Sequence, residues 1–185
     1  MPRSSDKRER LLRSADQLIL KQGFKQTTLA DIAEDSDVPL GNVYYYFRTK
    51  EAIGETVIES RLDSLRQLLQ KCSAETTPKA RLVAFLNYPI NTQTSLVEHG
   101  CPLGTLAYEL SRVDGFLRES SRSLIKEMLD WSTDQFEQMG QSNARSLGLR
   151  FVSQLQGMSL VANTLNDPQV ITDMVEQTRQ WIESL

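Results

Sequence analysis

Residues 40–47, LGNVYYYF, place a glycine, an amide and three tyrosines within a short stretch. If this stretch is a helix, successive side chains point about 100° apart. One side of the helix would then carry Gly41, Asn42, Tyr44 and Tyr45. Three adjacent tyrosines cannot all face a core under this rotation, so at least one is expected to be exposed. An exposed aromatic next to basic residues indicates a surface that contacts another molecule.

The residue types on that side suit contacts with DNA. A glycine lets a backbone approach closely, and an asparagine amide can bond to a base edge or a phosphate. A tyrosine offers a ring to thymine methyl groups and a hydroxyl to phosphate oxygens. A helix N-terminus and a lysine would supply further phosphate contacts. The sequence therefore predicts DNA contacts by Thr28, Gly41, Asn42, Tyr44, Tyr45 and Lys50.

A helix-turn-helix over residues 28–47 would hold these side chains in place. Thr28 is a suitable N-cap for the first helix, and Asp31 places negative charge in its first turn. In the polar turn that follows, Asp37 tolerates a left-handed conformation. Pro39 suits the first position of the second helix, where its missing N–H would have no partner. In this motif the second helix lies in the major groove, while Val43 and Phe47 would face the core with Leu40 and Tyr46 beside them.

Helical periodicity continues through the chain, and no alternating strand pattern is evident. Before the motif, a helix is predicted from Ser5 to Gln22. Thr49 is expected to cap a long helix from Lys50 to Cys72. Further helices are predicted at about 78–97, 103–111, 113–139, 143–165 and 168–184. The predicted fold class is all-α, with a three-helix DNA-binding domain over residues 1–50 and a helical bundle over residues 51–185.

The composition is that of a globular protein with an uneven charge distribution. Hydrophobic residues make up 39% of the 185 residues, charged residues make up 24%, and the net charge is -3. Residues 1–25 carry seven basic and three acidic residues, whereas residues 51–185 carry 12 basic and 17 acidic ones. A basic N-terminal region favours contact with a polyanion at that end. A solvated helix face would explain the same asymmetry.

Several function classes are disfavoured by what the sequence lacks. Cys72 and Cys101 are too few for a disulfide framework. No apolar run approaches the roughly 20 residues that span a membrane, and MPRSSDKRER is not a secretion signal. We therefore expect a cytoplasmic protein. With one histidine and no glycine-rich phosphate loop, we expect no enzyme activity and no cofactor, and His99 with Cys101 is too small a set for a metal site.

The run TTLADIAEDSDVPLGNVYYYFRTKEAI closely resembles the DNA-binding region of TetR-type (TetR/AcrR family) transcriptional regulators. The matching positions are Thr28, Ile32-Ala33, Gly41, Tyr44 to Phe47 and Lys50-Glu51. The resemblance is strong from residue 5 to about residue 60, and beyond that it is an all-helical layout of the right length. This sequence departs from the family pattern at Asp37, Pro39 and Leu40, where Gly, Ser or Thr, and a basic residue are common. The operator sequence therefore cannot be transferred from other members.

The resemblance also implies a homodimer that binds operator DNA and releases it when an effector binds. The last two helices, at about 143–165 and 168–184, would form a four-helix bundle with their counterparts in a second copy. Their apolar positions are Leu149, Val152, Leu155, Leu160, Val161, Ile171, Met174, Val175, Trp181 and Ile182. In a single chain these residues would be ordinary core.

An effector would occupy a cavity among the C-terminal helices. Candidate lining residues are Tyr88, Thr92, Leu103, Tyr108, Trp131, Phe136 and Met158. Each of them also suits a simple core position. Residues 51–185 would thus serve effector binding and dimerisation.

Cys101 is the sharper candidate for a sensor. It lies between Gly100 and Pro102, beside His99. Pro102 can begin a helix, which would place the thiol near a helix N-terminus and favour reaction with oxidants and electrophiles. The segment HGCPLGTLAYEL also resembles one found in a group of TetR-type regulators, some of which sense reactive electrophiles. The alternative is a small buried residue, as free cysteines often are.

Two other functions remain open from the sequence. A helical adaptor could bind a protein through the tyrosine face, and duplex binding with a steep salt dependence would separate it from a DNA-binding regulator. Activation instead of repression is also open, because the sequence does not encode where the operator lies relative to a promoter.

Overall fold

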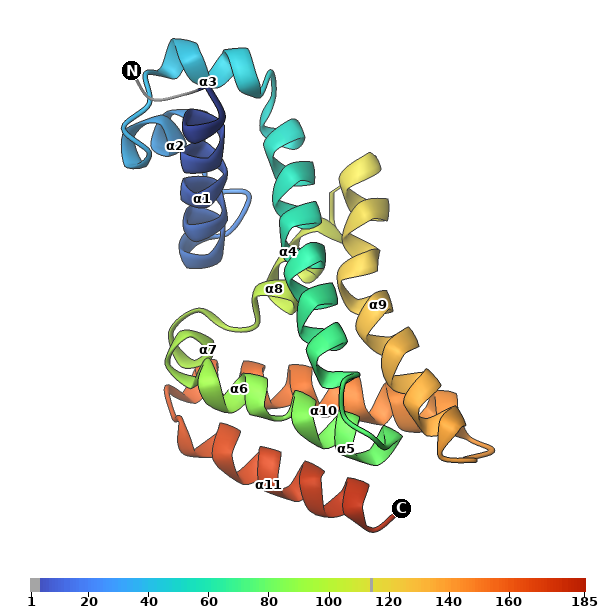
Figure 1. The fold of residues 1–185 in the computed structure, drawn as a ribbon. Helices are drawn as coiled ribbons and strands as arrows, with labels where there is room; N and C mark the ends of the chain where they lie inside the picture. Colours follow the sequence, from blue (N-terminus) through green and yellow to red (C-terminus); the bar gives the residue numbers. More distant parts are fainter. Residues whose placement is uncertain (1–3, 114) are drawn as a thin grey trace. The chain divides into compact units, whose positions relative to one another are not determined.

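The structure is a computed structural model that describes residues 4–113 and 115–185. Every regular element within these ranges is a helix, which confirms the predicted all-α fold class (Figure 1). The elements are α1 (Ser4–Gln22), α2 (Leu29–Asp35), α3 (Leu40–Tyr46), α4 (Lys50–Cys72), α5 (Pro78–Phe85), α6 (Asn87–Asn91), α7 (Gln93–His99), α8 (Pro102–Leu110), α9 (Phe116–Gln138), α10 (Ala144–Leu165) and α11 (Gln169–Glu183).

The chain forms two compact units. The N-terminal unit comprises the described residues of 1–62 and 105–123, and the C-terminal unit comprises residues 63–104 and 124–185. The N-terminal unit thus contains α1–α3, the first part of α4, most of α8 and the start of α9. The sequence assigns DNA binding to residues 1–50 and effector binding and dimerisation to residues 51–185. This assignment of functions stays a prediction.

In the N-terminal unit, α1 packs against α2 and buries one stripe of its side chains. Leu11, Ala15 and Ile19 follow helical spacing and are almost completely buried. α1 ends at Gln22, and Gly23 follows with a φ of +86°, the left-handed conformation that favours glycine. Burial of this stripe makes α1 the support for the two short helices that follow.

α4 joins this unit through a close contact and an ion pair. Gly54 lies against Phe24, and a Cβ at this position would come within 2.7 Å of the ring. Arg61 is 6% exposed, and its Nε donates to Asp16 Oδ1 of α1 over 2.7 Å. Because Arg61 is buried and Asp16 is partly exposed, removal of Asp16 would leave the buried guanidinium without this carboxylate partner. These contacts hold the first half of α4 against α1 and the loop that follows it.

The prediction of one continuous helix over residues 78–97 is wrong. This segment is helical but forms the three separate helices α5, α6 and α7. Pro89 explains the first interruption: it has no N–H to donate to Phe85, and its ring crowds the preceding turn. Thr92 separates α6 from α7 with a φ of -111°, and its Oγ1 donates to Tyr88 O. The helix expected from residue 113 begins at Phe116, after Gly115 with a φ of +94°.

The core of the C-terminal unit contains a cluster of aromatic rings. The ring of Phe85 lies 5.8 Å from both Trp131 and Phe151 and 6.3 Å from Tyr88. Aromatic pairs at such separations add to the stability gained from burial. The cluster therefore joins α5, α6, α9 and α10.

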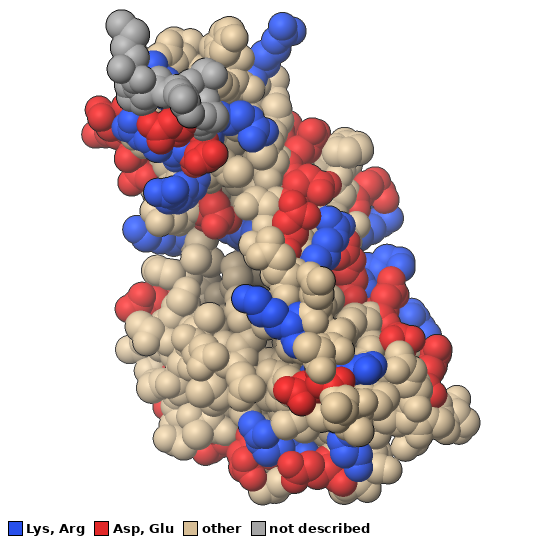
Figure 2. All heavy atoms as spheres, in the orientation of Figure 1, with Lys and Arg blue, Asp and Glu red and all other residues tan. Residues whose placement is uncertain are grey.

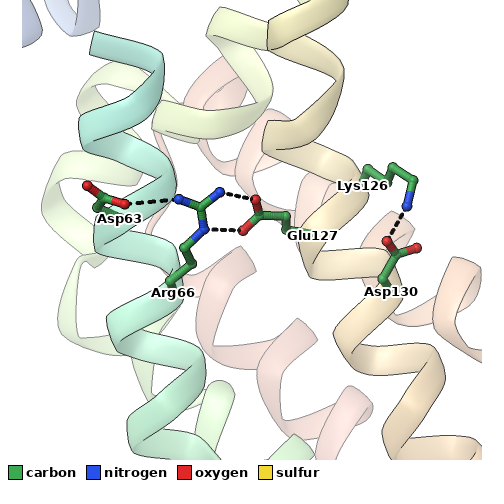
Figure 3. Close-up of polar contacts among 5 residues, drawn as sticks. All are labelled: Asp63, Arg66, Lys126, Glu127 and Asp130. Atoms are coloured by element: carbon green, nitrogen blue, oxygen red, sulfur yellow. Dashed lines mark hydrogen bonds and ion pairs between the residues drawn. The ribbon is translucent and has the colours of Figure 1, made fainter. Parts of the chain in front are cut away.

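Polar contacts also tie α4 to α9 within the C-terminal unit (Figure 3). Arg66 of α4 binds both carboxylate oxygens of Glu127, with Nε 3.0 Å from Oε2, and also Asp63 Oδ1 at 3.0 Å. Lys126 pairs with Asp130 one turn along α9. A bidentate arginine–carboxylate pair restricts geometry as well as supplying energy.

Candidate nucleic-acid interface

The N-terminus of α2 is closed by reciprocal hydrogen bonds. Thr28 is the N-cap, as predicted, and its Oγ1 accepts from Asp31 N at 3.1 Å. Asp31 Oδ2 accepts in turn from Thr28 N at 2.8 Å. This capping box satisfies two backbone donors that a helix start leaves unpaired. Thr28 remains exposed to solvent at the N-terminus of α2.

The turn between α2 and α3 is held by an arginine from α1. Asp37 has a φ of +51°, which confirms the predicted left-handed conformation. Arg10 donates to Ser36 O, to Asp37 O at 3.0 Å and to Asp37 Oδ2 at 3.2 Å. Two backbone carbonyls of the turn thus share one guanidinium. No local sequence signal pairs Arg10 with residues 26 and 27 positions away, so sequence reasoning missed it.

α3 is anchored by two apolar residues. Val43 and Phe47 are buried, as expected, and the guanidinium of Arg8 lies 5.6 Å from the centre of the Phe47 ring. Leu40 was expected beside this buried face but is 40% exposed, because it is the first residue of α3. Pro39 is the N-cap, one position earlier than predicted, since its ψ of 135° is not helical.

The opposite face of α3 is open. Tyr45 is 81% exposed and Tyr44 is 51% exposed, while Asn42 is partly buried. A Cβ at Gly41 would meet no atom within 4 Å. Tyr46 is half-buried and packs edge-on against Tyr45, with ring centres 5.1 Å apart. Four predicted contact residues therefore share one face of this short helix. They are Gly41, Asn42, Tyr44 and Tyr45.

Lys50 lies in a different environment from the one the sequence suggests. Its Nζ donates to Lys25 O at 2.8 Å and lies 4.7 Å from the centre of the Phe24 ring. Burial lowers the pKa of Lys50 below its usual value, and the charges of Glu109, Glu51 and Asp31 oppose that shift. The ammonium group therefore holds the loop between α1 and α2, and its predicted phosphate contact stays a prediction.

Basic and acidic side chains are interspersed on the N-terminal unit. Figure 2 shows this mixture on the face that it draws, in place of a patch of one sign. Among the exposed cations are Lys25, in the loop before α2, and Arg48, between α3 and α4. Lys25 precedes α2 and Arg48 follows α3 in the chain, and neither belongs to the predicted contact set.

The predicted effector residues are divided between the two units. Tyr108 belongs to the N-terminal unit, is 63% exposed and carries the guanidinium of Arg112 over its ring at 4.3 Å. The other candidates belong to the C-terminal unit, where Phe136 and Met158 are fully buried. The candidates that are partly buried in that unit are Tyr88, Thr92, Cys101, Leu103 and Trp131.

Cys101 lies immediately before α8, so the predicted helix start is confirmed. Its Sγ accepts from Gly104 N at 3.4 Å and from Gln156 Nε2 at 3.6 Å. A Cβ at Gly104 would collide with the side-chain oxygen of Gln156. His99 faces Glu98, with Nε2 3.6 Å from Oε2. Two N–H groups therefore converge on a half-buried sulfur.

The apolar positions of α10 and α11 divide into two sets. Val152, Leu155, Ile171, Val175 and Ile182 are buried within the C-terminal unit, and Met174 and Trp181 are partly buried against the same core. A second set lies exposed on α10, comprising Leu149, Leu160, Val161 and Leu165. Leu160 and Leu165 are 66% and 64% exposed, far more than core leucines. Large exposed apolar side chains in groups mark interaction surfaces.

Residues 4–113 and 115–185 contain neither a membrane-spanning helix nor a metal-binding cluster. In that part of the chain no helix is long and apolar enough to cross a membrane. Nor do those residues contain a group of three or more His, Cys, Asp or Glu side chains arranged to hold a metal ion.

Residues 11–57 match the family model described as bacterial regulatory proteins, tetR family. The transcriptional regulator LmrA of Bacillus subtilis is 32% identical over 145 residues, which cover 76% of this chain and 77% of LmrA. The transcriptional repressor NemR of Escherichia coli is 33% identical over 122 residues, which cover 65% of this chain but only 60% of NemR.

Solved structures share the fold. A TetR regulator from Legionella pneumophila has a TM-score of 0.84 at 20% identity, over 100% of this chain and 97% of that one. The reduced form of Escherichia coli NemR has a TM-score of 0.80 at 23% identity, over 93% of this chain and 94% of that one.

A helix-turn-helix with an open recognition helix, carried on an all-helical fold, defines a DNA-binding transcriptional regulator. The chain belongs to the TetR family of bacterial regulatory proteins. This is a family of transcriptional regulators, so membership confirms the prediction that the protein is not an enzyme.

Proposed function

We propose that this protein is a cytoplasmic repressor that binds operator DNA as a homodimer and releases it when an effector binds. The observation that carries the proposal is the open face of α3, formed by Gly41, Asn42, Tyr44 and Tyr45. Burying Val43 and Phe47 fixes the opposite face of the same short helix. Exposed tyrosine side chains on a short helix that is anchored on its opposite face suit insertion into a major groove.

In this proposal the residues have distinct roles. Tyr44, Tyr45 and Asn42 contact base edges or phosphates, and Gly41 allows close approach of the backbone. Thr28 contacts a phosphate at the start of α2, and Lys50 contributes positive charge nearby. Similarity to NemR, which is described as a repressor, favours repression over activation.

The test of DNA binding is selection of duplexes from fragmented genomic DNA, followed by titration of the selected duplex at several salt concentrations. Binding should weaken steeply with salt, and Tyr45→Ala should raise Kd about tenfold without loss of stability. As a control, Gln67→Ala alters an exposed position of α4 in the C-terminal unit and should leave Kd unchanged. If no duplex is selected, the protein is not a sequence-specific DNA-binding regulator.

Dimerisation is proposed through α10 and α11. The support is the exposed set on α10, because Leu160 and Leu165 would be costly to leave in water. Light scattering should give the mass of two chains for the natural protein and of one chain for Leu160→Asp. Gln67→Asp carries the same new charge outside this surface and should remain dimeric. A Leu160→Asp dimer would exclude this surface.

A reactive electrophile is proposed as one class of effector, with Cys101 as the reacting group. The support is the convergence of the Gly104 and Gln156 N–H groups on its half-buried sulfur, directly before the start of α8. That a structure of NemR is described as a reduced form fits a redox-active relative. Adding a quinone or hypochlorite should release DNA from the natural protein but not from Cys101→Ser. Equal release from both would exclude Cys101 as the sensor.

A further inference from the structure

The loop between α1 and α2 has two backbone N–H groups that a distant carboxylate binds. Glu109 Oε2 accepts from Phe24 N at 2.7 Å, and Glu109 Oε1 accepts from Lys25 N at 2.6 Å. Each oxygen of the carboxylate therefore takes one donor. Charge-assisted hydrogen bonds of this kind are about twice as strong as neutral ones. Glu109 is in α8, more than 80 residues away in the chain.

The surroundings of this contact leave the loop little freedom. A Cβ at Gly23 would lie 3.1 Å from the Glu109 carboxylate and would be strained by the φ of +86°. On the other side, the Phe24 ring is 6% exposed and lies against the bare backbone of Gly54. Lys50 Nζ donates to the carbonyl oxygen of Lys25, while the backbone N–H of Lys25 donates to Glu109. Residues of both α8 and α4 thus contact the loop and hold it in place.

The position of this loop matters because it leads directly into α2. Thr27 closes the loop on itself, with its Oγ1 donating to Gly23 O at 2.8 Å. The next residue, Thr28, is the N-cap of α2 and a proposed phosphate contact. α2 packs on α3, so the loop sets where the helix-turn-helix begins. A shift of residues 24 and 25 would therefore displace the reading helices.

We propose that Glu109 is a positioning residue for DNA binding, which holds the α1–α2 loop in the conformation that the helix-turn-helix needs. Glu109 does not itself contact DNA. The inference rests on the proposed function, because it assumes that α2 and α3 bind an operator. It goes further by making DNA affinity depend on α8, the helix that begins directly after Cys101. Movement of α8 would then change DNA affinity through this carboxylate.

The test compares Glu109→Gln with the matched control Glu119→Gln in the full-length protein, using the selected operator duplex. Glu119 is an exposed acid at the start of α9 in the same unit, paired with Arg122. Both substitutions remove one negative charge, which alone would favour binding to DNA. Glu109→Gln should nevertheless raise Kd about tenfold, because its amide NH2 faces a loop N–H. Glu119→Gln should bind as tightly as the natural protein or slightly more tightly.

Two further measurements separate positioning from other roles. The slope of log Kd against log salt concentration should be unchanged in Glu109→Gln, because no phosphate contact is lost. Amide hydrogen exchange at Phe24 and Lys25 should accelerate about tenfold, while exchange in the α1 core stays slow. A purely structural role would lower the melting temperature but would leave the Kd of the folded protein unchanged.

Glu109→Asp keeps the charge and withdraws the carboxylate by one methylene, so it provides a second variant if Glu109→Gln folds poorly. It should also weaken DNA binding. The inference is overturned if the natural protein binds the duplex and the folded Glu109 variants bind it equally well. If the natural protein selects no duplex, the proposed function fails, and the DNA-binding role of Glu109 fails with it.

Discussion

Gly41→Ala should make the free protein more stable and its complex with DNA weaker. Gly41 is the second residue of α3, and a Cβ there meets nothing within 4 Å. The new methyl group therefore causes no clash in the free protein. Alanine favours a helix over glycine by about 0.5–1 kcal/mol. For a chain of this size, that gain corresponds to roughly 2 °C in melting temperature.

The same open space is where the proposed function places DNA. Protein–DNA contacts are closely packed around a recognition helix, and forcing a methyl group into a packed site costs about 1–3 kcal/mol. Such a cost raises Kd by about 5-fold to 150-fold. The opposite signs of the two effects make the prediction specific, because general damage to α3 would lower stability and affinity together.

Thermal unfolding gives the first quantity, and fluorescence anisotropy with the selected duplex at one salt concentration gives the second. Gln67→Ala, on the exposed side of α4, serves as the control for each measurement. A stabilised Gly41→Ala protein with natural affinity would refute close approach of DNA to Gly41. Lower stability would refute the conclusion that the space beside Gly41 is free.

Three further outcomes are expected. Tyr45→Phe should leave the melting temperature unchanged, because the side chain is 81% exposed. Any rise in Kd then measures the contribution of the tyrosine hydroxyl to DNA binding. An unchanged Kd would show that this hydroxyl does not contact DNA. Arg10→Ala should lower the free energy of unfolding by about 1–2 kcal/mol in urea, because it frees the carbonyls of Ser36 and Asp37, and an unchanged midpoint would show that water replaces it without cost. Burial raises the pKa of Cys72 above its ordinary value of 9.0, so the unfolded chain loses this proton first as pH rises. Stability should therefore fall more steeply above about pH 9 in the natural protein than in Cys72→Ala, and parallel pH profiles would contradict this.

The local elements of the helix-turn-helix follow from neighbouring residues alone. Thr28 with Asp31 forms the cap that their spacing predicts, and Asp37 takes the left-handed position that an aspartate tolerates. Val43 and Phe47 are buried together because they are four residues apart on one helix. These are contacts over short sequence distances, for which residue type and spacing are sufficient information.

Where the structure departs from the sequence predictions, the causes are local and physical. Pro89 interrupts the helix expected over residues 78–97, because proline cannot donate its backbone hydrogen bond. Leu40 is the first residue of α3, where a side chain can lie outside the face that a longer helix would bury. Periodicity alone treats both positions as ordinary helical residues.

The sequence by itself determined the open tyrosine face of α3, because successive helical residues are rotated by a fixed angle. Tertiary structure decided what holds that face in place. Arg10 reaches the turn and Glu109 reaches the loop before α2 only after folding brings distant segments together. It also decided that Lys50 binds the carbonyl of Lys25. The physical reason is that a side chain's partner depends on which chain segments pack beside it, and helical spacing carries no information about segments more than 80 residues away.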